Sequence, residues 1–280
     1  MKSSRIKIVA DSSADITELD GVSFESVPLK IITDEKQYVD NEELDVYEMV
    51  DALSRYKGRS STSCPNADDW LRSFGDAEWV FCVTITGTLS GSCNSARAAA
   101  SLYEEEYPDR RVFVLDSLST GPETALMVDK IREFVLAGKS FDEICEAVSS
   151  YSRNTGLLFM LESMRNLANN GRVSPLVAKM AGILGIRVVG MASERGDLSV
   201  LDKCRGELKA LESLVGHMKE LGLEKGRVWI AHCFNEGAAN SLKEMIKKDF
   251  SAVQVKLYRC RGLCSFYTER GGLLVGFEKA

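Results

Sequence analysis

The sequence predicts an α/β fold in two parts: a parallel-sheet α/β domain over residues 1–154 and a smaller α+β domain over residues 155–280. Two observations lead to this prediction. In the first half, short apolar runs alternate with amphipathic runs, an order typical of parallel strands joined by crossover helices. In the second half, the turn SERGD separates two strand-like runs, as in an antiparallel hairpin, and helical runs surround it.

The elements of the first half are predicted from the spacing of apolar residues and from the residues that end strands or cap helices. Short apolar runs that end in polar loops predict buried strands at 5–10, 79–83 and 111–115. A further extended run at 23–32 contains Pro28, which lacks the N–H for a sheet ladder and favours an edge position. Helical periodicity and capping residues predict the helices, at 46–56, 66–74, from about 92, 124–138 and 141–152.

The second half is expected to mix strands, a hairpin and helices. The run LLFML at 157–161 leads into a turn-rich loop, NLANNGRVSP, and then into a helix at 174–184 that has proline in its first turn. The hairpin pairs 186–192 with 198–204. The remaining elements are expected as a helix at 206–221, a strand at 228–233, a helix at 236–248, and strands at 253–259 and 273–277.

The composition excludes several classes of function. The chain has 280 residues and a net charge of −6, which argues against nucleic-acid binding, because that requires a basic face. The N-terminal apolar stretch is too short for a signal peptide, and no run approaches the length of a membrane span. The eight cysteines lack metal-ligand spacing, so we expect reduced, mostly buried thiols, no metal and no cofactor.

Loops rich in serine and threonine follow the strand-like runs of the first half. They are DSSAD (11–15), SSTSCPN (60–66), TGTLSGS (86–92) and DSLSTG (116–121). Ligands of parallel sheets bind at the carboxyl ends of the strands, where several of these loops are expected to meet. Such residues also cap helices. Four such loops at one edge nevertheless favour a site for a carboxylate or a phosphate, held by hydroxyls, backbone N–H groups and a helix N-terminus.

A nucleophilic serine is the competing interpretation of Ser90. The residues around it do not match the G-x-S-x-G pattern of a nucleophile elbow, because Thr88 and Ser92 stand where the glycines belong. A Ser–His pair would need His217, which lies in a helical run, or His232, which ends an apolar strand. Nothing in the spacing favours a catalytic triad.

Six segments in this order resemble the DegV family over essentially the whole chain. They are IVADSSADI, VPLKIITDEKQYVDNEEL, STSCPN, TGTLSGSCNSA, VLDSLSTG and NLANNGRVS followed by GILGIRVV. DegV proteins are bacterial fatty-acid-binding proteins, and some present the fatty acid to a separate ATP-dependent fatty acid kinase. The resemblance implies two domains with the ligand between them, a parallel sheet in the first and a largely antiparallel sheet in the second.

The resemblance also implies the residues of a binding site. Thr62 and Ser90 should contact the carboxylate head group, with Gly91 and Ser92 beside it, and Arg172 corresponds to an arginine near the mouth of the site. The acyl tail should run between the domains, with LLFML and SPLVAKMAGILGI as candidate lining segments. The function implied is non-catalytic, cytoplasmic binding of a long-chain fatty acid. A serine-dependent acyl hydrolase and a binder of another small organic acid are the alternatives.

The chain departs from the family's pattern near its C-terminus. The family's motif T-H-T-G-P-G appears here as FYTERG, so that Tyr267 stands in place of the histidine that helps to close the head-group site. Glu269 and Arg270 replace a glycine and a proline, and Cys64 replaces a glutamine in the second hydroxyl loop. We expect the hydroxyl of Tyr267 to donate a hydrogen bond at the site.

Overall fold

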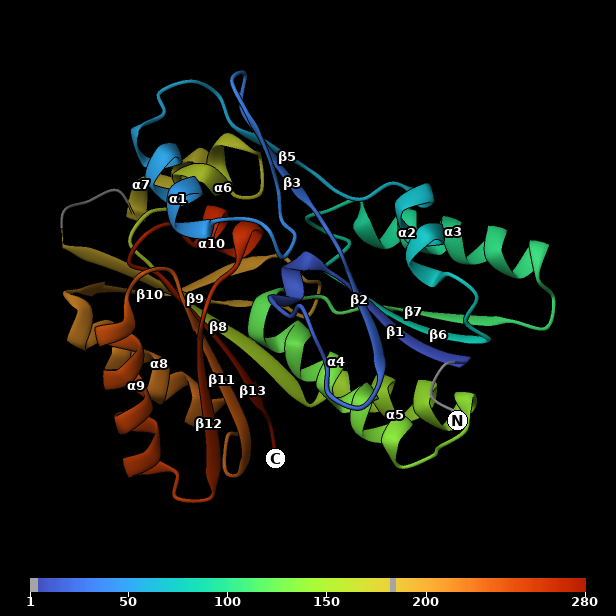
Figure 1. Ribbon diagram of the computed structural model, residues 1–280. Coiled ribbons are helices and arrows are strands. Elements are labelled where there is room, and N and C mark those ends of the chain that lie inside the picture. Colours follow the sequence, from blue (N-terminus) through green and yellow to red (C-terminus); the bar gives the residue numbers. More distant parts are fainter. Residues whose placement is uncertain (1–4, 182–184) are drawn as a thin grey trace.

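A four-stranded parallel sheet lies at the centre of the first half of the chain (Figure 1). The computed structural model describes residues 5–181 and 185–280. In spatial order the strands are β2 (Ser23–Val27), β1 (Ile6–Asp11), β6 (Trp79–Thr84) and β7 (Arg111–Asp116). The central strands are buried on both faces, which is why they appear in the sequence as continuous apolar runs.

Helices cover both faces of this sheet, and the alternation along β6 shows how. Val80 and Cys82 face one layer, while Phe81 and Val83 face the other. The first layer consists of α2 (Ala67–Phe74) and α3 (Ser92–Glu106), and the second of α4 (Gly121–Leu136) and α5 (Phe141–Arg153). Asn66 caps α2 in a capping box with Asp69, as its sequence predicts.

The extended run that contains Pro28 is not one strand. It forms β2 at the edge of the parallel sheet and then β3 (Lys30–Ile32) in a separate antiparallel sheet, because proline cannot donate to a ladder. The partners of β3 are β4 (Gln37–Val39) and β5 (Ser61–Ser63), and α1 (Val46–Arg55) packs beside them. The hydroxyl segment 60–66, expected as a loop, thus includes a strand.

The second half forms one six-stranded sheet. Its strands, in spatial order, are β10 (Leu198–Arg205), β9 (Ile186–Ala192), β8 (Thr155–Leu161), β13 (Leu273–Glu278), β11 (Gly226–His232) and β12 (Val253–Arg259). Every neighbouring pair is antiparallel except β11 and β12. This confirms the expected fold class and the predicted hairpin.

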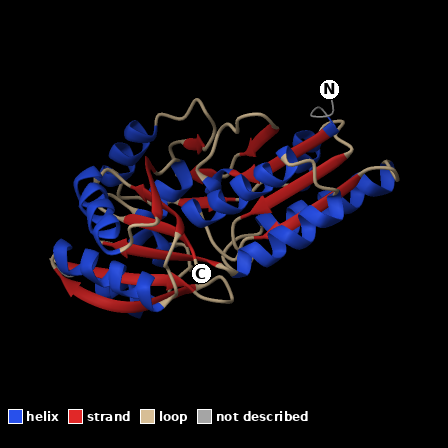
Figure 2. Cartoon of the chain, turned by 90° about the horizontal axis from the view of Figure 1, so that it is seen from below, coloured by secondary structure: helices blue, strands red, loops and turns tan. Residues whose placement is uncertain are grey.

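Helices α8 (Glu207–Glu220) and α9 (Glu236–Asp249) cover one face of this sheet, where they pack against Leu158, Met160 and Ile230. Helix α4 approaches the other face so closely that a Cβ on Gly276 of β13 would lie 2.4 Å from the backbone of Glu123. Helix α4 therefore packs against both sheets (Figure 1). Figure 2 shows helices beside the strands of the fold from a second direction. The domain boundary expected between residues 154 and 155 stays a prediction. Helix α4 contacts elements on both sides of this boundary.

Short helices differ from the predicted elements. The segment expected as a turn-rich loop contains α6 (Arg165–Asn169), and the helix expected at 174–184 is α7 (Pro175–Ala181), with 182–184 outside the described residues. Helix α10 (Gly262–Thr268) and the 3-10 turn η2 (Ser12–Ala14) were not predicted. No helix among residues 5–181 and 185–280 is long and apolar enough to cross a membrane.

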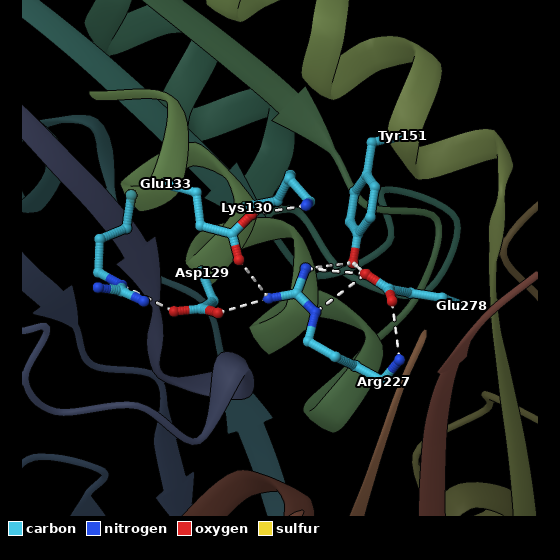
Figure 3. A network of polar contacts seen from close by, with 7 residues as sticks. Asp129, Lys130, Glu133, Tyr151, Arg227 and Glu278 are labelled. Carbon is cyan, nitrogen blue, oxygen red and sulfur yellow. Dashed lines mark hydrogen bonds and ion pairs between the residues drawn. The ribbon is translucent and has the colours of Figure 1, made fainter. Parts of the chain in front are cut away.

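A polar network around Arg227 joins the two halves (Figure 3). The Arg227 guanidinium, which is 14% exposed, contacts Asp129 at 2.6 Å and Glu133 at 2.9 Å on α4, and Glu278 at 2.8 Å on β13. Tyr151 of α5 donates to Glu278 at 2.7 Å. Burial alone would raise the pKa of Glu278, but the hydrogen bonds from Tyr151 and Arg227 and the charge of Arg227 outweigh burial and lower it.

We expect Arg227→Met to lower the free energy of unfolding by about 3 kcal/mol at pH 7, because it leaves the half-buried carboxylate of Glu278 without its cation. Asp129 and Glu133 keep their pairs with Arg132 and Lys130. A lowered folded-state pKa contributes stability above the unfolded value of 4.5, and this stability is lost as the pH falls through the folded pKa. The difference between the native and variant proteins should therefore shrink below about pH 4.5. Urea unfolding at pH 7 and at pH 3.5 measures both effects.

The matched control is Lys209→Met, which breaks an exposed pair with Glu212 and should leave the stability nearly unchanged. An Arg227→Met protein that is as stable as the control variant would contradict this role of the network.

Candidate functional site

A cavity of about 170 Å³ lies where the carboxyl ends of the parallel strands meet one face of the six-stranded sheet. Residues that follow β6 and β7 line one side, and residues of β8, β10 and β13 line the other. The lining residues include Thr62, Cys64, Thr86, Leu89, Ser90, Gly91, Thr120, Leu157, Phe159, Leu161, Leu167, Arg172, Gly196, Cys264, Tyr267 and Leu274. The cavity is thus built from both halves of the chain, at the sheet edge that the sequence predicts.

One wall of the cavity is apolar because alternate residues of β8 face it. Leu157, Phe159 and Leu161 point into the cavity, and Leu274 of β13 lies opposite Phe159 in the ladder. A Cβ at position 190 would lie 2.3 Å from the Phe159 ring, so Gly190 of β9 gives that ring its room. The candidate segment LLFML therefore lines the cavity through its odd-numbered residues. The other candidate segment, SPLVAKMAGILGI, lies partly outside the described residues.

Ser90 and Gly91 bring the loop between β6 and α3 to the cavity. The backbone N–H of Ser92, the first residue of α3, donates to the Ser90 hydroxyl at 3.2 Å and fixes its position. A Cβ on Gly91 would lie 3.1 Å from the sulfur of Cys64, so glycine lets the two hydroxyl segments approach each other. The result is a polar end of the cavity next to a helix N-terminus, which favours an anion.

Thr62 and Tyr267 face each other at the same cavity. Thr62 comes from β5 and Tyr267 from α10, and their hydroxyl oxygens share a hydrogen bond of 2.7 Å. Burial raises the pKa of Tyr267, although the bond from Thr62 and the charge of Arg172 act against this rise. The phenol is therefore a neutral hydrogen-bonding group at physiological pH. The structure thus brings Tyr267 and Thr62 together at the cavity, and the role of Tyr267 in binding stays a prediction.

Asp11 organises the polar loops from behind the cavity. Its carboxylate is fully buried at the end of β1, where it accepts from the Ser13 hydroxyl at 2.5 Å and from the Ile85 N–H at 2.9 Å. Ser92, which the resemblance places beside the ligand, donates its hydroxyl to Asp11 at 2.6 Å and is not among the lining residues. The Ser92 hydroxyl thus supports the loop that carries Ser90.

Helix α10 is held in place by two further buried carboxylates. Asp40 accepts from the N–H groups of Gly262 and Leu263, both at 2.8 Å, and so caps the helix. Asp15 accepts from the N–H of Arg261 at 3.0 Å. Because these acids belong to the first half of the chain, they fix Tyr267 relative to the hydroxyl loops. Sequence reasoning missed this helix and its caps.

Arg172 lines the cavity next to Leu89 and Ser90. Its Nε donates to the carbonyl of Leu89 at 3.2 Å, and a second nitrogen donates to the carbonyl of Asn170. The guanidinium therefore lies beside the hydroxyl loop without an ion pair among the described residues. This position corresponds to the edge of the site that the resemblance implies for it.

The tip of the β9–β10 hairpin completes the cavity, and sequence reasoning did not place it there. The Thr88 hydroxyl donates to the carbonyl of Arg195 at 2.5 Å. Gly196, with φ of +79°, lies so near Thr86 that a Cβ would be 2.1 Å from its hydroxyl oxygen. The glycine in SERGD was the available signal, since it allows this close contact in addition to the turn.

The histidines of the competing hydrolase interpretation lie away from Ser90. His217 on α8 contacts Asp202 and Glu220, at 2.8 and 2.9 Å. His232 accepts from the N–H of Asn235 at 3.3 Å, and burial, together with the charge of Arg259, lowers its pKa. Neither histidine is among the described residues that line the cavity. The carboxylate among the lining residues is Asp197 on the β9–β10 turn, and it accepts a hydrogen bond from the Ser193 hydroxyl.

A family model and a known relative both match nearly the whole chain. The family model described as "Uncharacterised protein, DegV family" matches residues 5–279. A DegV domain-containing protein of Streptococcus pneumoniae is 42% identical over 276 residues, which cover 97% of this chain and 98% of that protein.

Two solved structures resemble the fold over nearly its whole length. A DegV family protein from Eubacterium eligens, loaded with heptadecanoic acid, has a TM-score of 0.96 and 44% identity, over 98% of this chain and 100% of that one. The Fatty Acid Kinase B3 protein of Streptococcus pneumoniae, loaded with linoleic acid, has a TM-score of 0.95 and 41% identity, over 98% and 99%.

Proposed function

The chain belongs to the DegV family, and we propose that it binds a long-chain fatty acid without catalysing a reaction on it. The observation that carries this proposal is that one cavity joins neutral hydroxyls to an apolar wall. A fatty acid has the matching chemistry, a carboxylate that accepts hydrogen bonds and a tail that leaves water. Relatives at 41% and 44% identity hold linoleic and heptadecanoic acid.

Thr62, Ser90 and Tyr267 are the proposed head-group donors. Hydroxyls can turn toward a carboxylate. When no carboxylate is bound, Thr62 and Tyr267 are partners of each other through their hydrogen bond. Gly91 and the N-terminus of α3 add backbone polarity at the same place. Neutral donors hold the anion without a buried ion pair that release would have to break.

The apolar wall of β8 and β13 is the proposed tail site. Leu157, Phe159, Leu161 and Leu274 come from neighbouring strands and form one continuous surface. A small organic acid would leave this surface without a partner, so the wall favours an acyl chain over the alternative of a short acid.

We further propose that the bound fatty acid is presented to a separate, ATP-dependent fatty acid kinase. The similarity to the Fatty Acid Kinase B3 protein supports this partner. Arg172, at the edge of the hydroxyl loop, is the cation positioned to steer the head group or to face the kinase. The eight free cysteines agree with a reducing compartment, and we place the protein in the cytoplasm.

We expect Thr62→Ala and Ser90→Ala each to weaken fatty acid binding by about 1.5–3 kcal/mol, the contribution of a hydrogen bond to a charged group. Titration calorimetry with palmitic acid measures the change. Ser63→Ala is the matched control, because Ser63 neighbours Thr62 on β5 and is not among the lining residues. If the double variant binds as tightly as the Ser63→Ala protein, these hydroxyls do not hold the head group.

We expect binding to be nearly independent of pH between 6 and 8, because Tyr267 stays a neutral phenol over this range. A Tyr267→His protein should bind a carboxylate more tightly at pH 6 than at pH 8, since the imidazole gains a positive charge as the pH falls. Displacement of a fluorescent fatty acid at pH 6, 7 and 8 provides the comparison. A pH-dependent native protein, or a Tyr267→His protein without pH dependence, would remove Tyr267 from the head-group site.

A further inference from the structure

Glu269 has a backbone conformation that side chains other than glycine rarely adopt. It follows the last turn of α10 with φ of 54° and ψ of 167°. Glycine is the residue that ordinarily adopts this combination of angles, because a Cβ there is strained. The segment FYTERG places a glutamate at this point. A strained residue persists where the surrounding structure holds it, and such residues gather at functional sites.

The side chain of Glu269 contacts the neighbouring helix α6. Its Oε1 accepts from the backbone N–H of Asn166 at 3.0 Å, and the Asn166 side chain donates to the carbonyl of Phe266 at 2.8 Å. Asn166 is the donor in both hydrogen bonds, which tie the start of α6 to the end of α10. Glu269 takes part in no ion pair within the described residues, so this bond is the polar contact that its carboxylate makes.

Helix α6 forms part of the cavity wall through Leu167. Leu167 lines the cavity and packs in the same apolar cluster as Leu157 and Phe159 of β8. The carbonyl of Leu167 accepts from the N–H of Arg172 at 2.8 Å, and Arg172 in turn donates to Leu89, next to Ser90. A continuous set of hydrogen bonds therefore runs from α10 through α6 to the hydroxyl loop.

We propose that Glu269 is a positioning residue that holds α6 over the cavity and thereby slows the release of the bound lipid. The slowed release rests on the proposed function, whereas the restraint on α6 does not. A lipid under α6 can leave on this side only when α6 moves, and the Glu269–Asn166 bond opposes that movement. Glu269 makes this bond from a strained backbone conformation. Replacing glutamate by glycine should therefore relieve the strain and maintain or raise the stability, while it lowers the retention of the lipid.

Three variants separate the strain from the hydrogen bond. Glu269→Gly removes both, Glu269→Ala keeps the strain and removes the acceptor, and Glu269→Gln keeps the strain and an oxygen acceptor. Each is compared with the native protein in three measurements. These are thermal unfolding, hydrogen exchange of the Asn166 amide in lipid-free protein, and release of a fluorescent fatty acid into excess albumin.

We expect Glu269→Gly to be at least as stable as the native protein, yet to exchange the Asn166 amide and release the fatty acid about tenfold faster, the effect of one lost hydrogen bond. Glu269→Ala should show the same faster exchange and release together with lower stability. Glu269→Gln should resemble the native protein in all three measurements.

The proposal is overturned if Glu269→Gly exchanges and releases at native rates, or if release follows stability across the three variants. Hydrogen exchange needs no ligand, so the restraint on α6 is tested even if the native protein fails to bind fatty acid. Faster exchange without faster release would also overturn the proposal, because α6 would then not limit the departure of the lipid.

Discussion

The carboxylate of Asp11 is the constraint on which the site depends. It is fully buried, so its lone pairs must be satisfied by the protein, and donors from segments after β1 and β6 meet there. Burial raises its pKa, while the hydrogen bonds from Ser13, Ser92 and Ile85 favour the charged form. Satisfying one buried acid thus fixes the relative position of the loops, and with them the Ser90 hydroxyl.

The same principle brings the second half of the chain to the site. Asp40 caps α10 across 222 residues of sequence, and Asp15 holds Arg261, so that Tyr267 faces Thr62. Farther along α4, Arg227 binds carboxylates of both halves. The cavity between these restraints has a polar end supplied by loops and an apolar wall supplied by β8. Its two chemistries come from two different sheets.

Sequence reasoning predicted the parallel sheet, the sheet of the second half, most helices and the location of the hydroxyl loops, because these depend on local periodicity and on strand direction, but not the short sheet of β4, β3 and β5. It missed α10, because the residues GLCSFYT have low helix propensity. The residue that caps this helix, Asp40, is also far away in the sequence. It also could not separate core residues from cavity residues in LLFML. The alternation of side chains along a strand shows that they face two sides, but not which side is filled by core and which by the cavity. Ser92 shows the same limit, since only the fold reveals that its hydroxyl faces Asp11.

Mass spectrometry of the purified protein tests the central claim most directly, namely that the cavity holds a fatty acid without reacting with it. Under native conditions we expect a mass increase equal to one long-chain fatty acid, and under denaturing conditions the mass of the bare chain. A covalent acyl adduct at Ser90 that survives denaturation would contradict the account and favour a hydrolase. The absence of any lipid, even after incubation with palmitic acid, would contradict it as well.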